Sequence, residues 1–288
     1  MRKKSRIILI VFLLFTRVII FSSDLTIGWW NVENFFDTVR SPDSRDTVLS
    51  AASYQSKLDA VVNVILEMDA DILGLTEVEN IGVLRAIAER TGYSYYYLIE
   101  GNDPRGIDIA LLSRYQPVYY RSHRDMVVPY PGGPSYKFSR DCPEVKFIIS
   151  GREFYLLLNH LKSMYGDDPN GEAKRLAQTR GIISIVSEIY ENSSGDPAVI
   201  ILGDFNTYRN TPPLNLLERA GFTILNYKYS ESDVYTYNYN GQRSDIDYVI
   251  YNEHFIKIYR IERLQAIRYE RVREASDHYP LLIEVFVK

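Results

Sequence analysis

Three apolar runs in this chain end directly in acids, amides or histidines, and side chains of these types can hold a metal ion or move protons. The boundaries read LGLTEV at 73–78, LLLNHL at 156–161 and ILGDFN at 201–206. Strand ends form the ligand crevice of an α/β sheet, and a buried carboxylate there is costly unless a cation or partner neutralises it. We therefore expect several oxygen ligands and two histidines, His160 and His278, around one crevice.

These ligand types favour a hard divalent cation. Carboxylates, amides and water suit Mg²⁺, with Mn²⁺ or Ca²⁺ as alternatives. The single cysteine, Cys142, and the lack of a close His/Cys cluster exclude a structural zinc site and an intrachain disulfide. The sequence also has no Gly-rich loop followed by Lys-Ser/Thr and no serine elbow between glycines, which excludes a P-loop enzyme and a typical serine hydrolase.

The elements that must position these residues alternate along the chain, with helical periodicity in some segments and short apolar runs in others. Helices are expected over 54–68, 83–91, 172–191 and 212–220. Strands are expected over 26–30, 72–75, 95–98, 109–113, 118–121, 145–149, 153–158, 198–202, 247–251, 255–261 and 281–287. This mixture predicts one compact α/β domain over residues 24–288, in which paired sheets are covered by helices.

The charge of the chain limits how it could bind a polyanion. The formal charge is −4, but the first 23 residues hold five basic residues and no acid, so residues 24–288 carry 28 − 37 = −9. Such a body would not bind nucleic acid by bulk charge. Local basic groups and metal ions would have to hold the substrate. Tyrosines are grouped at 93–97 and 227–239, where they could pack on sheet faces or stack on bases or sugars.

Residues 1–23 are predicted to be a signal peptide or an N-terminal membrane anchor. A basic start precedes an apolar run from Ile7 to Phe15, and Ser22-Ser23 stand before Asp24. The segment is either a cleaved secretory signal or an uncleaved anchor that attaches the protein to a membrane through residues 7–21. A buried first element of a cytosolic domain is the remaining alternative. We expect an exported protein that is periplasmic, secreted or anchored in the cell envelope.

Eight segments in a fixed order resemble the endonuclease/exonuclease/phosphatase superfamily, which includes DNase I-like nucleases. They are WWNVENFFD at 29–37, LTEVEN at 75–80, RGIDIALLSRY at 105–115, FSRDCPEVKF at 138–147, LLNHLKS at 157–163, ILGDFNT at 201–207, SDIDYVIY at 244–251 and ASDHYPLLIEV at 275–285. The order of the segments makes the resemblance specific. It implies a four-layer α/β sandwich, in which two packed mixed β-sheets are flanked by helices.

The resemblance also implies roles for residues of the crevice. Glu77 is expected to be the principal metal ligand, with Asn31 and Asp277 nearby. Asp204 would align or deprotonate the attacking water, and Asn206 would orient it.

Two histidines and two other polar side chains are expected to act on the phosphate. His160 would bind a phosphate oxygen or donate a proton, and His278 would pair with Asp247. Members of the family differ over whether the Asp204 position or the Asp247–His278 pair is the general base, so both remain open. Arg140 resembles a phosphate-contacting arginine, and Asn159 beside His160 is expected to contact the substrate.

One segment departs from the family pattern. DNase I-like members usually carry a tyrosine in the stretch that reads Arg-Gly-Ile-Asp here, at 105–108. We therefore expect Asp108 to orient His160 in its place.

The function implied is that of an exported, metal-dependent nuclease that cleaves DNA or RNA backbone by in-line attack of water, with nucleic acid as substrate. The alternative is a phosphoesterase for a phospholipid headgroup, similar to a sphingomyelinase, or for an inositol phosphate. A non-enzymatic binding protein is a third hypothesis, and the intact set of polar residues argues against it. No stable protein partner is expected, and the protein is expected to be a monomer.

Overall fold

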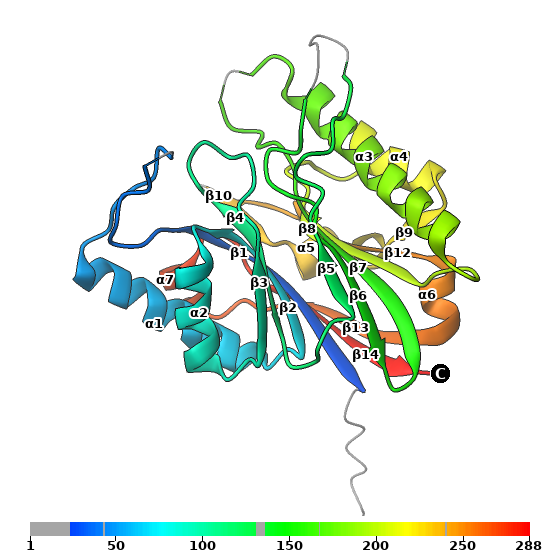
Figure 1. Ribbon diagram of the computed structural model, residues 1–288, viewed down its shortest axis with the longest axis horizontal. Coiled ribbons are helices and arrows are strands. Elements are labelled where there is room, and N and C mark those ends of the chain that lie inside the picture. Colours follow the sequence, from blue (N-terminus) through cyan, green and yellow to red (C-terminus); the bar gives the residue numbers. More distant parts are fainter. Residues whose placement is uncertain (1–23, 43, 131–135, 167, 240) are drawn as a thin grey trace, which may run out of the picture.

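Two six-stranded sheets packed face to face form the centre of the molecule, and helices cover the outer face of each (Figure 1). The computed structural model describes residues 24–42, 44–130, 136–166, 168–239 and 241–288. The predicted four-layer α/β sandwich is confirmed. The predicted signal peptide or anchor at 1–23 lies outside the described residues. Within those residues, no helix combines the length and the apolar character needed to cross a membrane.

The first sheet has the strand order β13-β14-β1-β2-β4-β3, and its outer face is covered by α1, α2 and α7. Its strands are β1 (Leu25–Phe35), β2 (Ile72–Val78), β3 (Tyr95–Leu98), β4 (Asp108–Ser113), β13 (Tyr259–Ala266) and β14 (Leu281–Val287). Its helices are α1 (Ala51–Met68), α2 (Ile81–Thr91) and α7 (Glu270–Ala275).

The second sheet has the order β5-β6-β7-β8-β12-β9, and α3 and α4 cover its outer face. Its strands are β5 (Tyr119–Arg121), β6 (Glu144–Ile149), β7 (Arg152–His160), β8 (Val199–Asp204), β9 (Phe222–Ile224) and β12 (Asp247–Asn252). Its helices are α3 (Gly171–Asn192) and α4 (Pro212–Arg219). A separate hairpin of β10 (Tyr237–Tyr239) and β11 (Gln242–Ser244) follows the 3₁₀ helix η1 (Leu225–Lys228) and the short helix α5 (Glu231–Val234).

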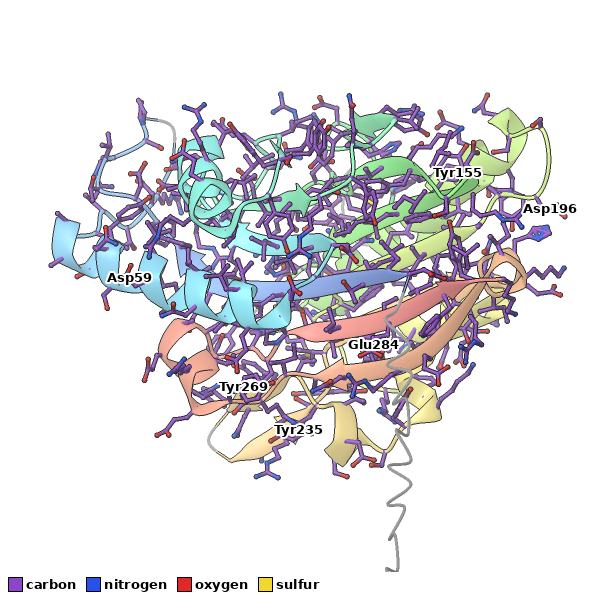
Figure 2. The ribbon with its side chains drawn as sticks, turned by 90° about the horizontal axis from the view of Figure 1, so that it is seen from below. Asp59, Tyr155, Asp196, Tyr235, Tyr269 and Glu284 are labelled. Carbon is purple, nitrogen blue, oxygen red and sulfur yellow. The ribbon has the colours of Figure 1, made fainter. Side chains whose placement is uncertain are left out.

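Apolar side chains fill all three spaces between the layers, and Figure 2 shows the molecule with its side chains from below. Trp29, Phe147 and Leu158 are fully buried between the sheets. Burial of each such side chain contributes about 1.5–3 kcal/mol relative to exposure, so the sheet-to-sheet core holds the strand ends in place. Cys142 is a buried free thiol, as its lack of any partner cysteine predicts.

Two parallel strand pairs bring the reactive residues to one end of the sandwich. In the first sheet β1 pairs with β2, and Asn31 lies opposite Thr76. In the second sheet β7 pairs with β8, and His160 lies opposite Asp204. A hydrogen bond of 3.1 Å from Asn31 Nδ2 to Asp204 Oδ2 joins the two sheets here. The carboxyl ends of all four strands therefore border the same crevice.

Local capping explains where several elements begin. Asn80 accepts hydrogen bonds from Gly82 N and Val83 N, and α2 ends at Gly92 in the left-handed region, as the sequence predicts. The strand predicted over 255–261 is wrong in its first half. The Asn252 side chain accepts from Phe255 N, which starts the short helix α6 (Glu253–Ile258), and β13 begins only at Tyr259.

Candidate active site

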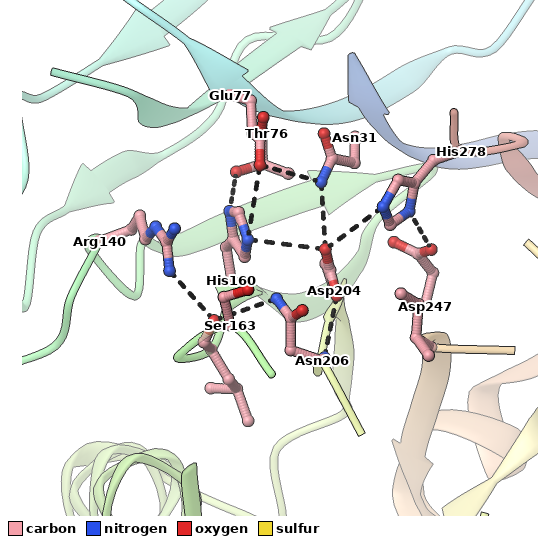
Figure 3. Close-up of polar contacts among 12 residues, drawn as sticks. Asn31, Thr76, Glu77, Arg140, His160, Ser163, Asp204, Asn206, Asp247 and His278 are labelled. Atoms are coloured by element: carbon pink, nitrogen blue, oxygen red, sulfur yellow. Dashed lines mark hydrogen bonds and ion pairs between the residues drawn. The ribbon is translucent and has the colours of Figure 1, made fainter. Parts of the chain in front are cut away.

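A cavity of about 550 Å³ opens where the strand ends of the two sheets meet. Glu77 at the end of β2, His160 at the end of β7 and Asp204 at the end of β8 line it. His278 enters from the segment before β14 (Figure 3). These side chains come from segments far apart in the sequence, so only the folded sandwich brings them together.

Asp204 is the centre of the cavity's polar network. Its Oδ2 lies 3.5 Å from His160 Nε2 and 3.9 Å from His278 Nε2. Its Oδ1 accepts a hydrogen bond of 2.9 Å from the backbone N–H of Asn206. One carboxylate thus faces two histidines that reach it from opposite sides (Figure 3).

His278 is held by a carboxylate. Its Nδ1 bonds to Asp247 Oδ2 at 2.8 Å, and the other oxygen of Asp247 accepts a 2.8 Å hydrogen bond from Trp29 Nε1. Burial alone would lower the pKa of His278, but Asp247 outweighs it, with help from Asp204 and Asp277, and raises that pKa to about 10. The His278 imidazole is therefore a cation at neutral pH.

His160 is held by a neutral partner. Its Nδ1 bonds to Thr76 Oγ1 at 2.8 Å, and the ring is almost completely buried. Burial, followed by the positive charges of Arg140, Arg105 and His278, keeps the pKa of His160 well below its usual value. Its Nε2 faces the carboxylates of Asp204 and Glu77, at 3.5 and 3.9 Å, which favours a proton on Nε2. His160 is therefore neutral and offers an N–H to the cavity.

The backbone around the cavity is strained. Glu33, Asn34, Glu77 and Asn206 all have positive φ, between 46° and 65°, although none is glycine. Such conformations cost roughly 1–3 kcal/mol each and gather at functional sites. At Glu77 the conformation is stabilised by a 2.8 Å hydrogen bond from Asn34 N to Glu77 Oε2.

The carboxylates of Glu77 and Asp204 fit a divalent cation. Both are buried, and within the described part of the chain no Lys or Arg lies within 4 Å of either. Burial and the nearby Asp247 carboxylate raise the pKa of Asp204, as expected where negative charges are crowded together out of water. Glu77 would hold the ion, and Asp277, which lines the cavity with 35% of its side chain exposed, would complete the oxygen set.

Asn31, also predicted as a metal ligand, points its amide nitrogen at the carboxylates. Nδ2 donates to Asp204 at 3.1 Å and weakly to Glu77 at 3.4 Å, while Oδ1 accepts from Glu33 N at 2.9 Å. Asn31 therefore bridges the carboxylates of Asp204 and Glu77 by hydrogen bonds from its amide nitrogen.

A second group of ligand atoms lies close by, formed by Asp204, Asp247 and His278 within 4.8 Å of one another. Since Asp247 already bonds to His278 and to Trp29, we interpret this group as a histidine–carboxylate pair beside the metal site, and not as the ligand set itself.

The predicted phosphate-binding arginine reaches the cavity from the loop before β6. Arg140 is 3% exposed and lines the cavity wall. Its Nη2 lies 2.9 Å from Asp103 Oδ2, and its Nη1 donates to Leu161 O at 3.1 Å. Leu161 O also accepts from Asn206 Nδ2 at 3.2 Å, so Arg140 and Asn206 are fixed by one carbonyl.

Two of the predicted site residues lie elsewhere. Asp108 does not orient His160, because Thr76 bonds to His160 Nδ1 and the Asp108 carboxylate instead accepts a 2.6 Å hydrogen bond from Gly101 N. Asn159 does not line the cavity. Side chains alternate along a strand, so Asn159 points away from His160 toward the layer of α3 and is fully buried there.

Several functional neighbours were not singled out from the sequence. Thr76 and Trp29 stand inside the LTEV and WWNV motifs, where their contacts to His160 and Asp247 depend on which face of the strand they occupy. Tyr165, Tyr237 and Tyr239 form an aromatic wall on one side of the cavity. The predicted stacking group at 227–239 includes two of them.

Comparison with known proteins gives one family. A model described as the endonuclease/exonuclease/phosphatase family matches residues 26–262. No curated protein matches the chain.

Solved structures share the fold. The human Nocturnin catalytic domain is 17% identical, with a TM-score of 0.67, over 92% of this chain and 94% of that one. A Bacteroides thetaiotaomicron mannosyl-6-phosphatase is 18% identical, with a TM-score of 0.63, over 91% and 99% of the two chains. D. rerio TDP2 with a single-strand DNA product is 17% identical, with a TM-score of 0.62, over 91% and 98%.

Proposed function

Because this chain belongs to the endonuclease/exonuclease/phosphatase family and is a metal-dependent phosphoesterase, we propose that it is a nuclease that hydrolyses the backbone of DNA or RNA. The observation that carries the proposal is the pair of histidines on Asp204, one neutral and one cationic, opposite the Glu77 carboxylate. A phosphodiester is an anion, and its hydrolysis requires charge cancellation, a positioned water and a proton for the leaving oxygen.

The residues divide these tasks. Glu77 and Asp277 would hold a divalent cation, which would cancel negative charge on the phosphate. Asp204, whose pKa is raised by burial and by Asp247, aligns the water and takes its proton. His160 donates its Nε2–H to a phosphate oxygen. The cationic His278 stabilises the growing negative charge and supplies the proton for the leaving oxygen, and Asp247 keeps it charged.

The aromatic wall favours a nucleic acid over a lipid headgroup. Tyr165 and Tyr239 are 67% and 49% exposed at the cavity, and Tyr237 and Tyr239 lie almost parallel. Bases stack on such rings without regard to sequence. The structure of D. rerio TDP2, a complex with a single-strand DNA product, also agrees with this choice, whereas the mannosyl-6-phosphatase points to sugar phosphates as the alternative.

We also propose that the protein acts outside the cytoplasm as a monomer, with the domain beginning at residue 24. The basic and apolar character of residues 1–23 supports export. Cell fractionation combined with N-terminal sequencing tests this. A full-length chain in the cytosol with its original N-terminus would contradict export.

The test of the activity is plasmid nicking. Residues 24–288 are incubated with supercoiled plasmid and Mg²⁺, with EDTA as the metal-free control. Nicking is expected with Mg²⁺, and EDTA or the His160→Ala change should abolish it. The matched control is His254→Ala. His254 pairs with Asp196, which lies at the edge of the molecule (Figure 2), and neither residue lines the cavity, so this variant should remain fully active.

If the plasmid and a single-stranded oligonucleotide both remain intact under these conditions, the nuclease proposal is contradicted. Release of inorganic phosphate from a sugar or inositol phosphate, or of phosphocholine from a phospholipid, by the same protein would then identify the alternative substrate class.

A further inference from the structure

A second hollow of about 690 Å³ opens beside the active-site cavity. Arg105, Arg140, Ser163 and Tyr165 line both spaces, so the second hollow continues the first. We call it the basic groove, defined by Arg105, Lys137, Arg140, Lys162 and Lys174.

The charge of this groove is opposite to that of the whole chain. Among the described residues, the groove is lined by five cationic side chains and one acid, Asp103, whereas the whole chain has a net charge of −4. Two further acids, Asp125 and Asp168, pair with Lys137 and Lys174, which leaves 5 − 3 = +2 in the groove. Asp103 forms ion pairs with both arginines. Its Oδ1 lies 3.2 Å from Arg105 Nε, and its Oδ2 lies 2.9 Å from Arg140 Nη2. The boundary between cavity and groove is therefore positive even after pairing.

Among the described residues, Lys162 has the most distant acidic partner of the five groove cations. Asp168 lies 2.8 Å from Lys174 Nζ but 4.0 Å from Lys162 Nζ. The pKa of Lys162 is lowered, because burial outweighs the attraction of Asp168 and the positive charges of Arg140, Lys174 and Arg175 lower it further. An anion beside Lys162 would relieve this repulsion.

Arg140 links the groove to the reaction. It is 3% exposed, and its Nε finds no hydrogen-bond partner among the described residues. A buried guanidinium nitrogen without a partner is costly, and an anion beside the guanidinium would offset part of that cost through its charge. Tyr136 adds an aromatic face, with Lys174 Nζ 5.3 Å from its ring centroid.

We propose that the basic groove binds the phosphates that follow the scissile one, so that the substrate is a single strand of nucleic acid lying across both spaces. This rests on the proposed nuclease function and narrows it. Grooves that combine cations along a backbone with exposed aromatic rings are the binding mode of single strands. Tyr165, which lines both spaces, stacks on the base between the two phosphates.

Binding without cleavage tests the groove. The full-length protein is titrated in EDTA with a fluorescein-labelled single-stranded oligonucleotide, and anisotropy is measured from low to high salt. Lys162→Gln should raise the Kd about fivefold at low salt and reduce the slope of log K against log salt by about 0.7. Lys162→Arg keeps the charge and should restore both values.

The matched control is Lys257→Gln, an exposed lysine that pairs with Glu253 on α6 and should leave Kd and slope unchanged. Equal slopes for wild type and Lys162→Gln would overturn the proposal. Tighter binding of a duplex than of the single strand, or binding of inositol hexakisphosphate but not of the strand, would also overturn it.

A separate readout distinguishes the two proposals. If wild type with Mg²⁺ hydrolyses neither the oligonucleotide nor bis(4-nitrophenyl) phosphate, the nuclease proposal fails, while the anisotropy slopes still decide whether the groove holds a strand. If both substrates are hydrolysed, Lys162→Gln should lower kcat/KM for the oligonucleotide more than for the small diester. Equal losses on both would assign Lys162 to the reaction centre and overturn its role in the groove.

Discussion

The two histidines of the cavity face the same carboxylate from two different surroundings. His278 has a carboxylate on its Nδ1, and its pKa is raised to about 10. His160 has a threonine hydroxyl on its Nδ1, and burial keeps its pKa well below the usual value. Both rings are buried, so burial does not separate them. The group that bonds to Nδ1 therefore decides which histidine is charged, and so which histidine can transfer a proton.

The largest effect is expected from Asp247→Asn, which makes the His278 site resemble the His160 site. Without the carboxylate, burial should leave His278 neutral, and kcat on a phosphodiester should fall about 10²–10⁴-fold. Steady-state kinetics at pH 7.5 with saturating Mg²⁺ measures this. A loss below threefold would show that the charge of His278 does not matter.

His160→Leu removes the neutral donor and keeps a side chain of moderate size at its place. We expect kcat to fall about 10²–10³-fold, the usual loss for one transition-state hydrogen bond, with little change in KM. The same assay checks it. A rise in KM at constant kcat would place His160 in ground-state binding instead.

Thr76→Val tests the support of His160. Valine has the same shape as threonine but no hydroxyl, so His160 loses its 2.8 Å contact on Nδ1 and should lose orientation. Loss of such a supporting contact typically costs about 10–100-fold, and Thr76→Ser should recover most of the activity. If the Thr76→Val and Thr76→Ser proteins have the same kcat, the hydroxyl of Thr76 does not position the His160 ring.

A smaller effect is expected in the pH dependence of stability, and it distinguishes His278 from His160. The pKa of His278 is raised from about 6.5 to about 10 on folding, so its stabilisation is complete below about pH 6.5 and is lost as pH rises toward 10. Urea midpoints of the protein in EDTA should therefore fall between pH 7 and 10, and by less in Asp247→Asn. Equal falls in both proteins would contradict the raised pKa.

The smallest effect is expected at Asp108, the carboxylate that the sequence assigned to His160. Burial raises its pKa from 3.8 to about 7, so the folded state loses stability as pH rises between these values, and the loss is complete above pH 7. Asp108→Asn should leave kcat unchanged, leave stability unchanged at pH 4, and raise it at pH 8. Denaturation midpoints at the two pH values and one kinetic assay measure these outcomes. A large loss of kcat would show that the Asp108 carboxylate does take part in the reaction.

These results show which parts of the site a sequence can predict. The residues at strand ends, the four layers and the Asp247–His278 contact follow from motifs in a fixed order and from strands that end at one edge. Side-chain direction was harder to predict. Asn159 and His160 are neighbours in the chain, but the alternation of a strand sends them to opposite faces of the sheet.

Other features depend on contacts between distant segments. The bond of Thr76 to His160 crosses from one sheet to the other, and the left-handed φ of Glu77 beside it is not encoded by a glycine. Two tyrosines of the aromatic wall, Tyr237 and Tyr239, are placed by the β10–β11 hairpin, and no apolar run in the sequence predicts this hairpin. Sequence patterns report local periodicity, and these features arise only when the sheets pack.

The most direct test of this account is the protonation of the two rings. Long-range ¹H–¹⁵N spectra of the histidine-labelled protein in EDTA at pH 7.5, assigned with His160→Gln and His278→Gln, report the state of each nitrogen. We predict protons on both nitrogens of His278 and on Nε2 alone of His160, with His278 titrating near pH 10. Two rings that titrate together near pH 6.5 would contradict the division of roles around Asp204.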